Sequence, residues 1–183
     1  MSYSYKGKIL ISTPDLSGDI FSRSLVLLLE HTTDGAFGLI LNKKKGKSFS
    51  ASDTLDLTKD AVWYEGGPVE PSRHFFLIKG QTTNEDSFRI NENYYVTENW
   101  KLVVKGILDG EIDLQNIKFF EGYSGWFAGQ LESEIARKAW TPVDIHNLDY
   151  TTRDDENLWK KLMQNLGGEY LLWANAPEDI SMN

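Results

Sequence analysis

The 183-residue sequence contains no cysteine and only three histidines. The absence of cysteine excludes disulfides, thiolate zinc sites, iron–sulfur clusters and cysteine nucleophiles. His31, His74 and His146 lie far apart, and no His-x-His or His-x-x-x-His pair exists to supply two metal ligands from one element. The sequence therefore predicts neither a metal site nor a bound cofactor.

Long apolar runs are also absent. The longest, Leu25 to Leu29, is far shorter than the roughly 18 residues that a membrane-spanning helix needs. The first ten residues, MSYSYKGKIL, lack the apolar region of a signal peptide. We therefore expect a cytoplasmic protein with no membrane partner. At roughly 150 residues per domain, the length predicts one domain over residues 1–183, with a tail at 175–183.

Positive charge is scarce, with 19 Lys and Arg against 27 Asp and Glu, which gives a net charge of −8. Affinity for nucleic acid comes largely from basic side chains that neutralise phosphates, so this acidic balance argues against a nucleic-acid partner. One basic cluster is the exception: Lys43, Lys44, Lys45 and Lys47. We interpret residues 43–60 as a mobile loop, and we expect any anionic partner to bind through these four lysines.

Hydrophobic runs predict strands over 8–11, 24–30 and 36–41, with Asp34-Gly35 as the turn of a hairpin between the last two. Shorter strands are predicted over 62–64, 74–78, 88–90, 94–96, 117–120 and 143–145. The order of these runs, hairpins first and β–α alternation later, indicates an α+β domain with a mainly antiparallel or mixed sheet and helices packed on it.

Helical spacing of apolar residues predicts three helices. The first follows Thr97 as N-cap and ends before Gly110. The second begins after the Gly122–Gly125 turn and carries Phe127, Leu131 and Ile135 on one face. The third follows Thr151 or Thr152 and is closed by Gly167-Gly168, after which YLLWANAPEDISMN at 170–183 is predicted to finish the chain without a further helix.

The segment Gly122-Tyr123-Ser124-Gly125-Trp126 invites comparison with the G-x-S-x-G elbow of serine hydrolases. Its second glycine comes one residue too early, and the only downstream His and acid, Asp144 and His146, have no typical triad spacing. A serine hydrolase is therefore disfavoured. Gly66-Gly67-Pro68 lacks the spacing of a dinucleotide fingerprint and predicts a turn.

Five ordered blocks carry a family resemblance: KILISTPDL at 8–16, IFSRSLVLLLEH at 20–31, DGAFGLILN at 34–42, EGGPV at 65–69 and GYSGWFAGQLESEIARKAW at 122–140. From Gly7 to Trp173 the chain resembles the YqgE/AlgH family of uncharacterised bacterial proteins. The resemblance implies a single α+β domain with a strongly bent, coiled sheet flanked by helices, and it implies no particular activity. Some members carry the label of transcriptional regulator, which neither a helix-turn-helix motif nor the net charge supports here.

Two positions depart from the family pattern. The family usually has Ala where this chain has Ser124, which argues against a serine nucleophile. Many members have His where this chain has Ile78, which argues against a catalytic His at that position.

We hypothesise a non-catalytic binding or regulatory domain for a protein or small-molecule ligand, because no acid, base, nucleophile or metal set converges in the sequence. The candidate binding residues, expected near the hairpin and the Gly122–Trp126 segment, are Arg23, Glu30, His31, Asn42, Gly66, Gly67, Tyr123, Trp126, Gln130 and Glu132. A purely structural role stays open for them, with Arg23 paired to Glu132 and Asn42 capping a strand end.

Two alternatives stay open. The first is a hydrolase that uses Glu30, His31 or Glu132 as acid and base, which requires two of them within about 3 Å of each other in a concave pocket. The second is a protein–protein interaction module whose acidic surface meets a basic partner.

Overall fold

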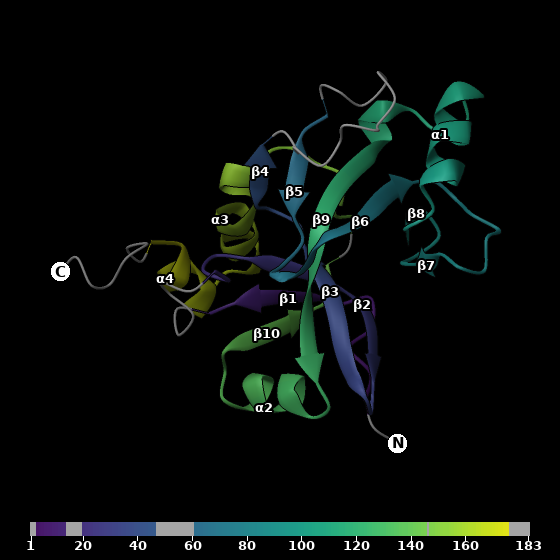
Figure 1. The fold of residues 1–183 in the computed structure, drawn as a ribbon. Coiled ribbons are helices and arrows are strands. Elements are labelled where there is room, and N and C mark those ends of the chain that lie inside the picture. The colour runs from purple at the N-terminus through teal and green to yellow at the C-terminus, as the bar shows by residue number, and fades with distance from the viewer. Residues whose placement is uncertain (1–2, 14–19, 47–60, 146, 176–183) are drawn as a thin grey trace.

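The computed structural model describes residues 3–13, 20–46, 61–145 and 147–175 (Figure 1). Within these residues, ten strands form one sheet in which the order β10-β1-β2-β3-β9-β6-β8-β7 is continuous, and β5 joins β9 and β4 beside it. The strands are β1 (Ile9–Ser12), β2 (Leu25–Thr32), β3 (Gly35–Ile40), β4 (Lys44–Gly46), β5 (Trp63–Glu65), β6 (Val69–Lys79), β7 (Phe88–Arg89), β8 (Tyr94–Thr97), β9 (Ile117–Phe127) and β10 (Trp140–Val143). Among these pairs only β5 and β9 are parallel, which confirms the predicted α+β class with a mainly antiparallel, mixed sheet.

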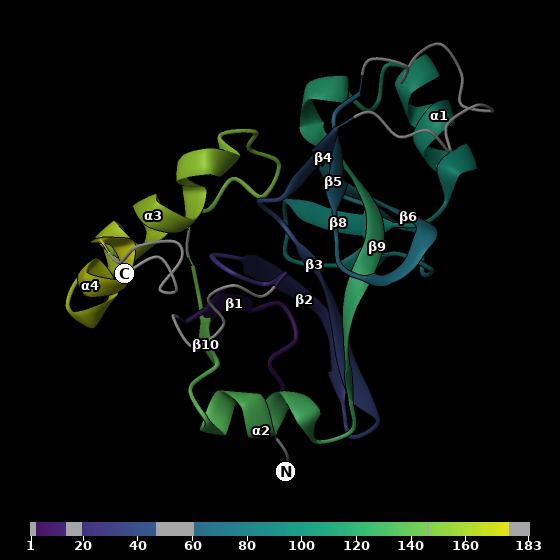
Figure 2. The same cartoon turned by 60° about the vertical axis from the view of Figure 1, so that its left-hand side comes forward.

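The long strand β9 connects the two halves of the sheet. Its first part, Ile117 to Glu121, pairs with β5 and β6, and its last part, Ser124 to Phe127, pairs with β3. Gly122 lies between the two parts with φ +70°, and β6 is irregular between Val69 and His74 opposite it. Such irregularities increase bending and twist, and Figure 2 shows β9 running through both halves of the bent sheet.

Each helical region covers a different apolar cluster of the sheet. The helices are α1 (Trp100–Leu108), the 3₁₀ turn η4 (Leu114–Asn116), α2 (Gln130–Ala136), α3 (Asp155–Leu166) and α4 (Glu169–Asn175). Helix α1 contributes Val103 to one cluster, α2 contributes Leu131 to a second, and α3 contributes Leu158, Trp159, Leu162 and Met163 to the largest. The three helical regions accordingly lie apart around the sheet (Figures 1 and 2).

The predicted hairpin is confirmed. Strands β2 and β3 pair antiparallel through the turn after Thr32, with Thr32 opposite Gly35. Leu25 to Leu29 are fully buried, after which exposed and buried residues alternate: Glu30 and Thr32 face solvent while His31 is buried. A bulge between Leu28 and Glu30 shifts the pairing register there.

The predicted strand–turn–helix at 117–135 is wrong in its middle part. The strand continues to Phe127, and α2 begins only at Gln130, after Gly129 at φ +76°. Pairing with β3 satisfies the backbone of Ser124 to Phe127, so the segment stays extended despite its glycines. Ser124 is buried within the strand and donates a hydrogen bond to the carbonyl oxygen of Gly66 at 3.0 Å, so it forms no nucleophile elbow.

Several predicted boundaries are corrected as well. Asn99, not Thr97, caps α1, because its side chain accepts a hydrogen bond from the N–H of Leu102. Helix α3 begins at Asp155 rather than directly after Thr151 or Thr152. Residues 169–175, expected as a tail, form α4, and the last strand lies at 140–143 rather than 143–145. The rest of the predicted tail, 176–183, lies outside the described residues.

The predicted loop at 43–60 is corrected at its start, and three lysines there contact groups of the chain itself. Lys43 Nζ donates to the carbonyl oxygen of Ile20 at 2.7 Å. Lys44 Nζ lies 3.3 Å from Asp155, and Lys45 Nζ lies 2.8 Å from Glu121. Residues 44–46 form β4 rather than part of a loop. Lys47 and the remainder of the predicted loop to residue 60 lie outside the described residues.

A buried lysine fixes the start of α3 to the sheet. Lys118 on β9 is fully buried, and its Nζ donates to the carbonyl oxygen of Thr152 at 2.8 Å and to Asp155 Oδ1 at 3.1 Å. The hydroxyl of Tyr64 donates to the other oxygen of Asp155 at 2.5 Å, and the Lys118 ammonium lies 4.0 Å from the centre of the Tyr64 ring. Burial lowers the pKa of Lys118 from 10.5 to about 8, against the opposing effect of Asp155.

This lowered pKa predicts a pH dependence of stability. Between pH 8 and pH 10 the unfolded chain still protonates Lys118 while the folded chain releases the proton, so the free energy of unfolding rises with pH. We expect the wild-type protein to gain on the order of 2 kcal/mol relative to Lys118→Met over this range, measured by urea unfolding. Lys101→Met, at an exposed position of α1, is the control. Parallel curves for wild type and Lys118→Met would contradict the assignment.

The turn Gly66-Gly67 packs its backbone directly on β9. A Cβ on Gly66 would lie 2.3 Å from the carbonyl oxygen of Gly122, and one on Gly67 would lie 2.2 Å from the carbonyl carbon of Tyr123. The N–H of Gly66 donates to the carbonyl oxygen of Glu121 at 2.9 Å. These two candidate residues therefore have a structural role, which is to let two backbones approach at the bend of the sheet.

We expect Gly67→Ala to destabilise the fold by about 3 kcal/mol or more, because the new Cβ meets backbone atoms that cannot move aside. Gly110→Ala is the matched control, since Gly110 also has positive φ (+74°) but has no atom within 4 Å of its Cβ position. It should lose only the left-handed backbone preference, about 1–2 kcal/mol. Equal losses in thermal or urea unfolding would contradict the close-packing explanation.

Candidate functional site

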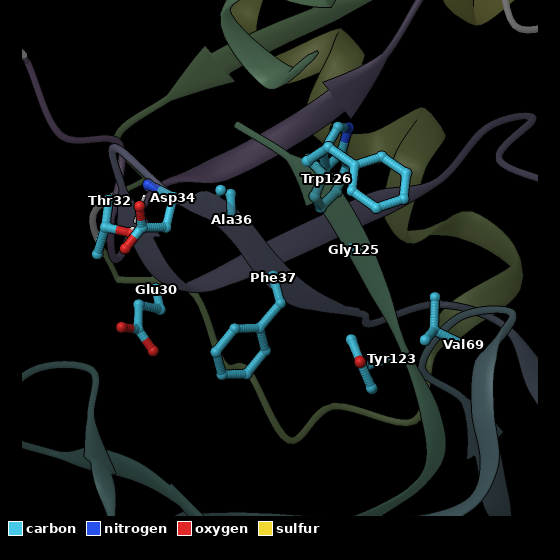
Figure 3. Close-up of a pocket in the computed structure, with 11 residues that line it drawn as sticks. Glu30, Thr32, Asp34, Ala36, Phe37, Val69, Tyr123, Gly125 and Trp126 are labelled. Atoms are coloured by element: carbon cyan, nitrogen blue, oxygen red, sulfur yellow. Dashed lines mark hydrogen bonds between the residues drawn. The ribbon is translucent and has the colours of Figure 1, made fainter. Parts of the chain in front are cut away.

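A hollow of about 420 Å³ lies on one face of β2, β3 and the end of β9 (Figure 3). Its lining residues are Glu30, Thr32, Asp34, Gly35, Ala36, Phe37, Val69, Tyr123, Gly125, Trp126 and Phe127. This volume lies within the range of small-molecule sites, roughly 300–1,000 Å³. The hollow is therefore the candidate binding site.

Strand register explains why this face is hollow. Gly35 pairs with Phe127, and Phe37 pairs with Gly125, so each glycine lies opposite an aromatic residue on the same face. Gly125 leaves space on this face, since a Cβ there would come no closer than 3.4 Å to the Tyr123 ring and 3.8 Å to Val69, and the aromatic rings border that space. A Cβ on Gly35 would instead lie 2.4 Å from the carbonyl oxygen of Trp126, so Gly35 lets β3 approach β9 closely. Phe127 is 85% exposed, which is unusual for so large an apolar side chain.

The aromatic wall is held in place by ring contacts. The rings of Phe37 and Tyr123 lie edge to face with centroids 5.8 Å apart, and Phe88 and Phe75 support them at 5.3 Å and 6.0 Å. Burial and the neighbouring carboxylate of Glu70 raise the pKa of the Tyr123 hydroxyl, so it stays protonated at neutral pH. The wall is thus neutral and largely preformed.

The rim of the hollow is acidic. Glu30 stands opposite Phe37 in the β2–β3 pair, and Thr32 stands opposite Gly35 on the same face. Asp34 in the turn adds a second carboxylate. Among the described residues, no hydrogen bond or ion pair reaches the carboxylate of Glu30 or Asp34. The lining residues include no Lys, Arg or His.

His31 and Glu132 form a pair on the other face of the sheet. His31 Nε2 lies 2.7 Å from Glu132 Oε1, His31 Nδ1 accepts a hydrogen bond from the N–H of Tyr5 at 2.9 Å, and the imidazole stacks on the Tyr5 ring. This network assigns the Nε2–H tautomer. Two of the three proposed acid–base residues, His31 and Glu132, therefore contact each other, but only the third, Glu30, lines the hollow. Both His31 nitrogens are engaged in hydrogen bonds, so neither has a lone pair available for general base catalysis.

Glu132 is likewise a poor proton donor. A hydrogen bond from its own backbone N–H at the start of α2, and then the bond to His31, hold the pKa of the Glu132 carboxyl below its usual value. At neutral pH the carboxyl is ionised and accepts the hydrogen bond from His31 Nε2–H. The pair joins α2 to β2, which is a structural task.

We expect the nitrogen NMR spectrum of His31 at pH 8 to show a protonated Nε2 and an unprotonated Nδ1, because Nδ1 accepts from the Tyr5 N–H. Glu132→Gln should retain this tautomer, since its side-chain oxygen still accepts from Nε2. A protonated Nδ1 would contradict the assigned network and reopen a catalytic role for His31.

Glu134 is a hydrogen-bond acceptor that the sequence did not single out. It accepts from Trp126 Nε1 at 2.8 Å, from Trp140 Nε1 at 3.1 Å and from Gln130 Nε2 at 2.9 Å. Gln130 in turn accepts from the N–H of Phe127 at 3.0 Å and closes the turn between β9 and α2. The candidate residues Trp126 and Gln130 thus position the end of β9.

Arg23 and Asn42 lie at the opposite end of the hairpin. Asn42 accepts from the N–H of Leu25 at 3.0 Å and donates to the carbonyl oxygen of Arg23 at 2.8 Å, which confirms the strand-end cap. The guanidinium of Arg23 lies 5.1 Å from the centre of the Trp159 ring. Glu132 binds His31 instead, so the suggested Arg23–Glu132 pair is wrong.

The structure therefore brings three of the ten candidate residues to the hollow: Glu30, Tyr123 and Trp126. The other eight lining residues were not predicted from the sequence: Thr32, Asp34, Gly35, Ala36, Phe37, Val69, Gly125 and Phe127. The alternation of Tyr123, Gly125 and Phe127 was the available signal, but it is visible only once this segment is assigned to a strand.

No group of three or more His, Asp or Glu side chains in the described ranges is placed to hold a metal ion. Within the same ranges, no helix is both long and apolar enough to cross a membrane.

The fold is that of a single-domain α+β protein with a bent, mainly antiparallel sheet, and a hollow large enough for a small molecule lies on one face of it. Residues 9–171 match the AlgH-like family, and the chain belongs to that family. It is 36% identical over 179 residues to a UPF0301 protein of Cytophaga hutchinsonii, covering 97% of this chain and 98% of that protein. A UPF0301 protein of Parabacteroides distasonis is also 36% identical, over 186 residues, covering 97% of this chain and 91% of the relative.

Solved structures agree with the fold. The solution structure of the AlgH protein from Pseudomonas aeruginosa superposes with a TM-score of 0.73 at 25% identity, covering 97% of this chain and 99% of that one. A crystal structure of a Corynebacterium diphtheriae protein gives a TM-score of 0.76 at 19% identity, covering 96% and 94% of the two chains. The family resemblance predicted from the sequence blocks is thereby confirmed.

Proposed function

We propose that this protein is a non-catalytic binding domain and that its ligand occupies the hollow beside Phe37, Tyr123 and Phe127. The observation that carries the proposal is a neutral aromatic wall beside two exposed carboxylates on the rim, which have no partner among the described residues. Apolar walls with a few placed polar groups are typical of small-molecule sites. A cytoplasmic location, predicted from the sequence, belongs to the same proposal.

Two observations favour binding over catalysis. The hollow holds no nucleophile with a neighbouring base, since its lining side chains able to donate or accept protons are Glu30, Asp34, Thr32 and Tyr123. The acid–base pair that does form, His31 with Glu132, faces the other side of the sheet and is committed to internal hydrogen bonds. A hydrolase would need these groups to converge on one cavity.

The acidic rim also argues against direct recognition of DNA by this site. Phosphate contacts come from Lys and Arg, and three of the clustered lysines are bound to groups of the chain itself. A regulatory role, if the protein has one, would therefore act through a ligand or a partner protein.

A thermal-shift screen of metabolites, nucleotides and divalent metals tests the proposal with a blocked variant. Gly125→Leu places a side chain into the hollow, and Gln115→Leu adds the same side chain at an exposed position of η4, outside it. A ligand at 100 times its Kd stabilises the folded state by about 2.7 kcal/mol, which raises Tm by about 5–10 °C for a protein of this size.

We expect at least one compound to raise the Tm of wild type and Gln115→Leu but not that of Gly125→Leu. A compound that stabilises Gly125→Leu equally would contradict the hollow as its site. No shift across the whole screen would contradict a small-molecule ligand and favour the protein-partner alternative.

A further inference from the structure

We infer that the hollow selects a small organic cation, a protonated or quaternary amine on an apolar or aromatic body. The inference rests on the proposed function and adds the chemical class of the ligand. It depends on how the carboxylates, the aromatic rings and the guanidinium of Arg73 are placed around the space beside Gly125.

The two carboxylates lie on one side of the hollow. Glu30 is the direct cross-strand neighbour of Phe37, and Figure 3 shows its carboxylate beside that ring, with Asp34 near the same end of the strands. Neither carboxylate has a partner among the described residues. A cation bound against Phe37 would supply one, whereas an anionic ligand would meet two like charges with no lining cation to offset them.

The aromatic residues suit the same ligand. Phe37, Tyr123 and Phe127 line the hollow around Gly125, and aromatic faces attract ammonium and guanidinium groups through the ring quadrupole. The Tyr123 ring already has such a contact on the protein side, because the guanidinium of Arg73 lies 5.3 Å from its centre. The wall is thus both apolar and favourable to positive charge.

Arg73 does not make the hollow a site for anions. Its guanidinium donates to Glu98 at 2.5 Å and to Glu70 at 3.1 Å, and these two carboxylates raise its pKa further. The three side chains together carry a net negative charge. The net charge at the Tyr123 end of the hollow is therefore negative, like that of the Glu30 and Asp34 carboxylates, and it also attracts a cation.

A series of three probes that share one aromatic body and differ in charge tests the inference: 2-phenylethylammonium, 2-phenylethanol and phenylacetate. Backbone amide NMR titrations follow Gly35, Phe37 and Gly125, which line the hollow. We expect the ammonium probe to bind at least about tenfold more tightly than the alcohol, with phenylacetate weakest. The preference should shrink as salt is raised, because both carboxylates are exposed enough to be screened.

Variants assign the selectivity to the rim. Glu30→Gln with Asp34→Asn should bring the affinity for the ammonium probe close to that for the alcohol while leaving the alcohol unchanged. Glu92→Gln with Glu111→Gln removes the same charge from two exposed positions outside the hollow and should retain the full preference.

The outcomes separate the two proposals. Equal binding of the ammonium and alcohol probes at these amides would overturn the cation inference and leave the hollow standing as a ligand site. No response to any probe would overturn both, since the shared aromatic body should enter a hollow of this size. Tighter binding of a Gly-Lys-Gly peptide than of the ammonium probe would assign the hollow to a protein side chain and overturn its small-molecule form.

Discussion

The close approach of the Gly66-Gly67 backbone to β9 is the contact on which the rest of the structure depends. Ser124 donates to the carbonyl oxygen of Gly66, whose own N–H donates to Glu121. The same carbonyl accepts the N–H of Ile40, so this turn ties β9 to the strand end of β3 as well. Because no Cβ intervenes, β9 can bend at Gly122 and pass from its pairing with β6, which reaches Tyr123, to its pairing with β3 from Ser124 without ending. One continuous strand thereby serves both halves of the bent sheet.

The hollow is a direct consequence of that continuity. If β9 ended at Gly122, Gly125 and Phe127 would not lie opposite Phe37 and Gly35, and neither the aromatic wall nor the space beside it would exist. The turn held by Gln130 and the three hydrogen bonds to Glu134 then fix the end of the strand against α2. The candidate residues outside the hollow act by holding this frame.

Charge is divided between the interior and the rim. Lys118, Lys44 and Lys45 neutralise Asp155 and Glu121, two buried acids that would be costly to leave unpaired. Two members of the basic cluster, in which the sequence predicts the place for an anionic partner, thus join β4 to α3 and to β9. Within the part of the chain that the structure describes, the carboxylates of Glu30 and Asp34 have no such partner, which is why we propose a ligand of opposite charge for the hollow that they border.

The sequence by itself determined the α+β class, the β2–β3 hairpin and the first and third helices. Turn-forming residues and the spacing of apolar residues determine these features, and both are visible among residues close in the sequence. It also identified the family. It could not decide whether residues 122–129 form a strand or the start of a helix. The spacing of Phe127, Leu131 and Ile135 is typical of a helix, whereas pairing with β3 requires an extended strand. Only the tertiary structure decided this, since the backbone of Ser124 to Phe127 bonds to a strand about 90 residues earlier in the chain. The hollow depends on the same β3–β9 register, so the pattern of neighbouring residues in the sequence could not predict it.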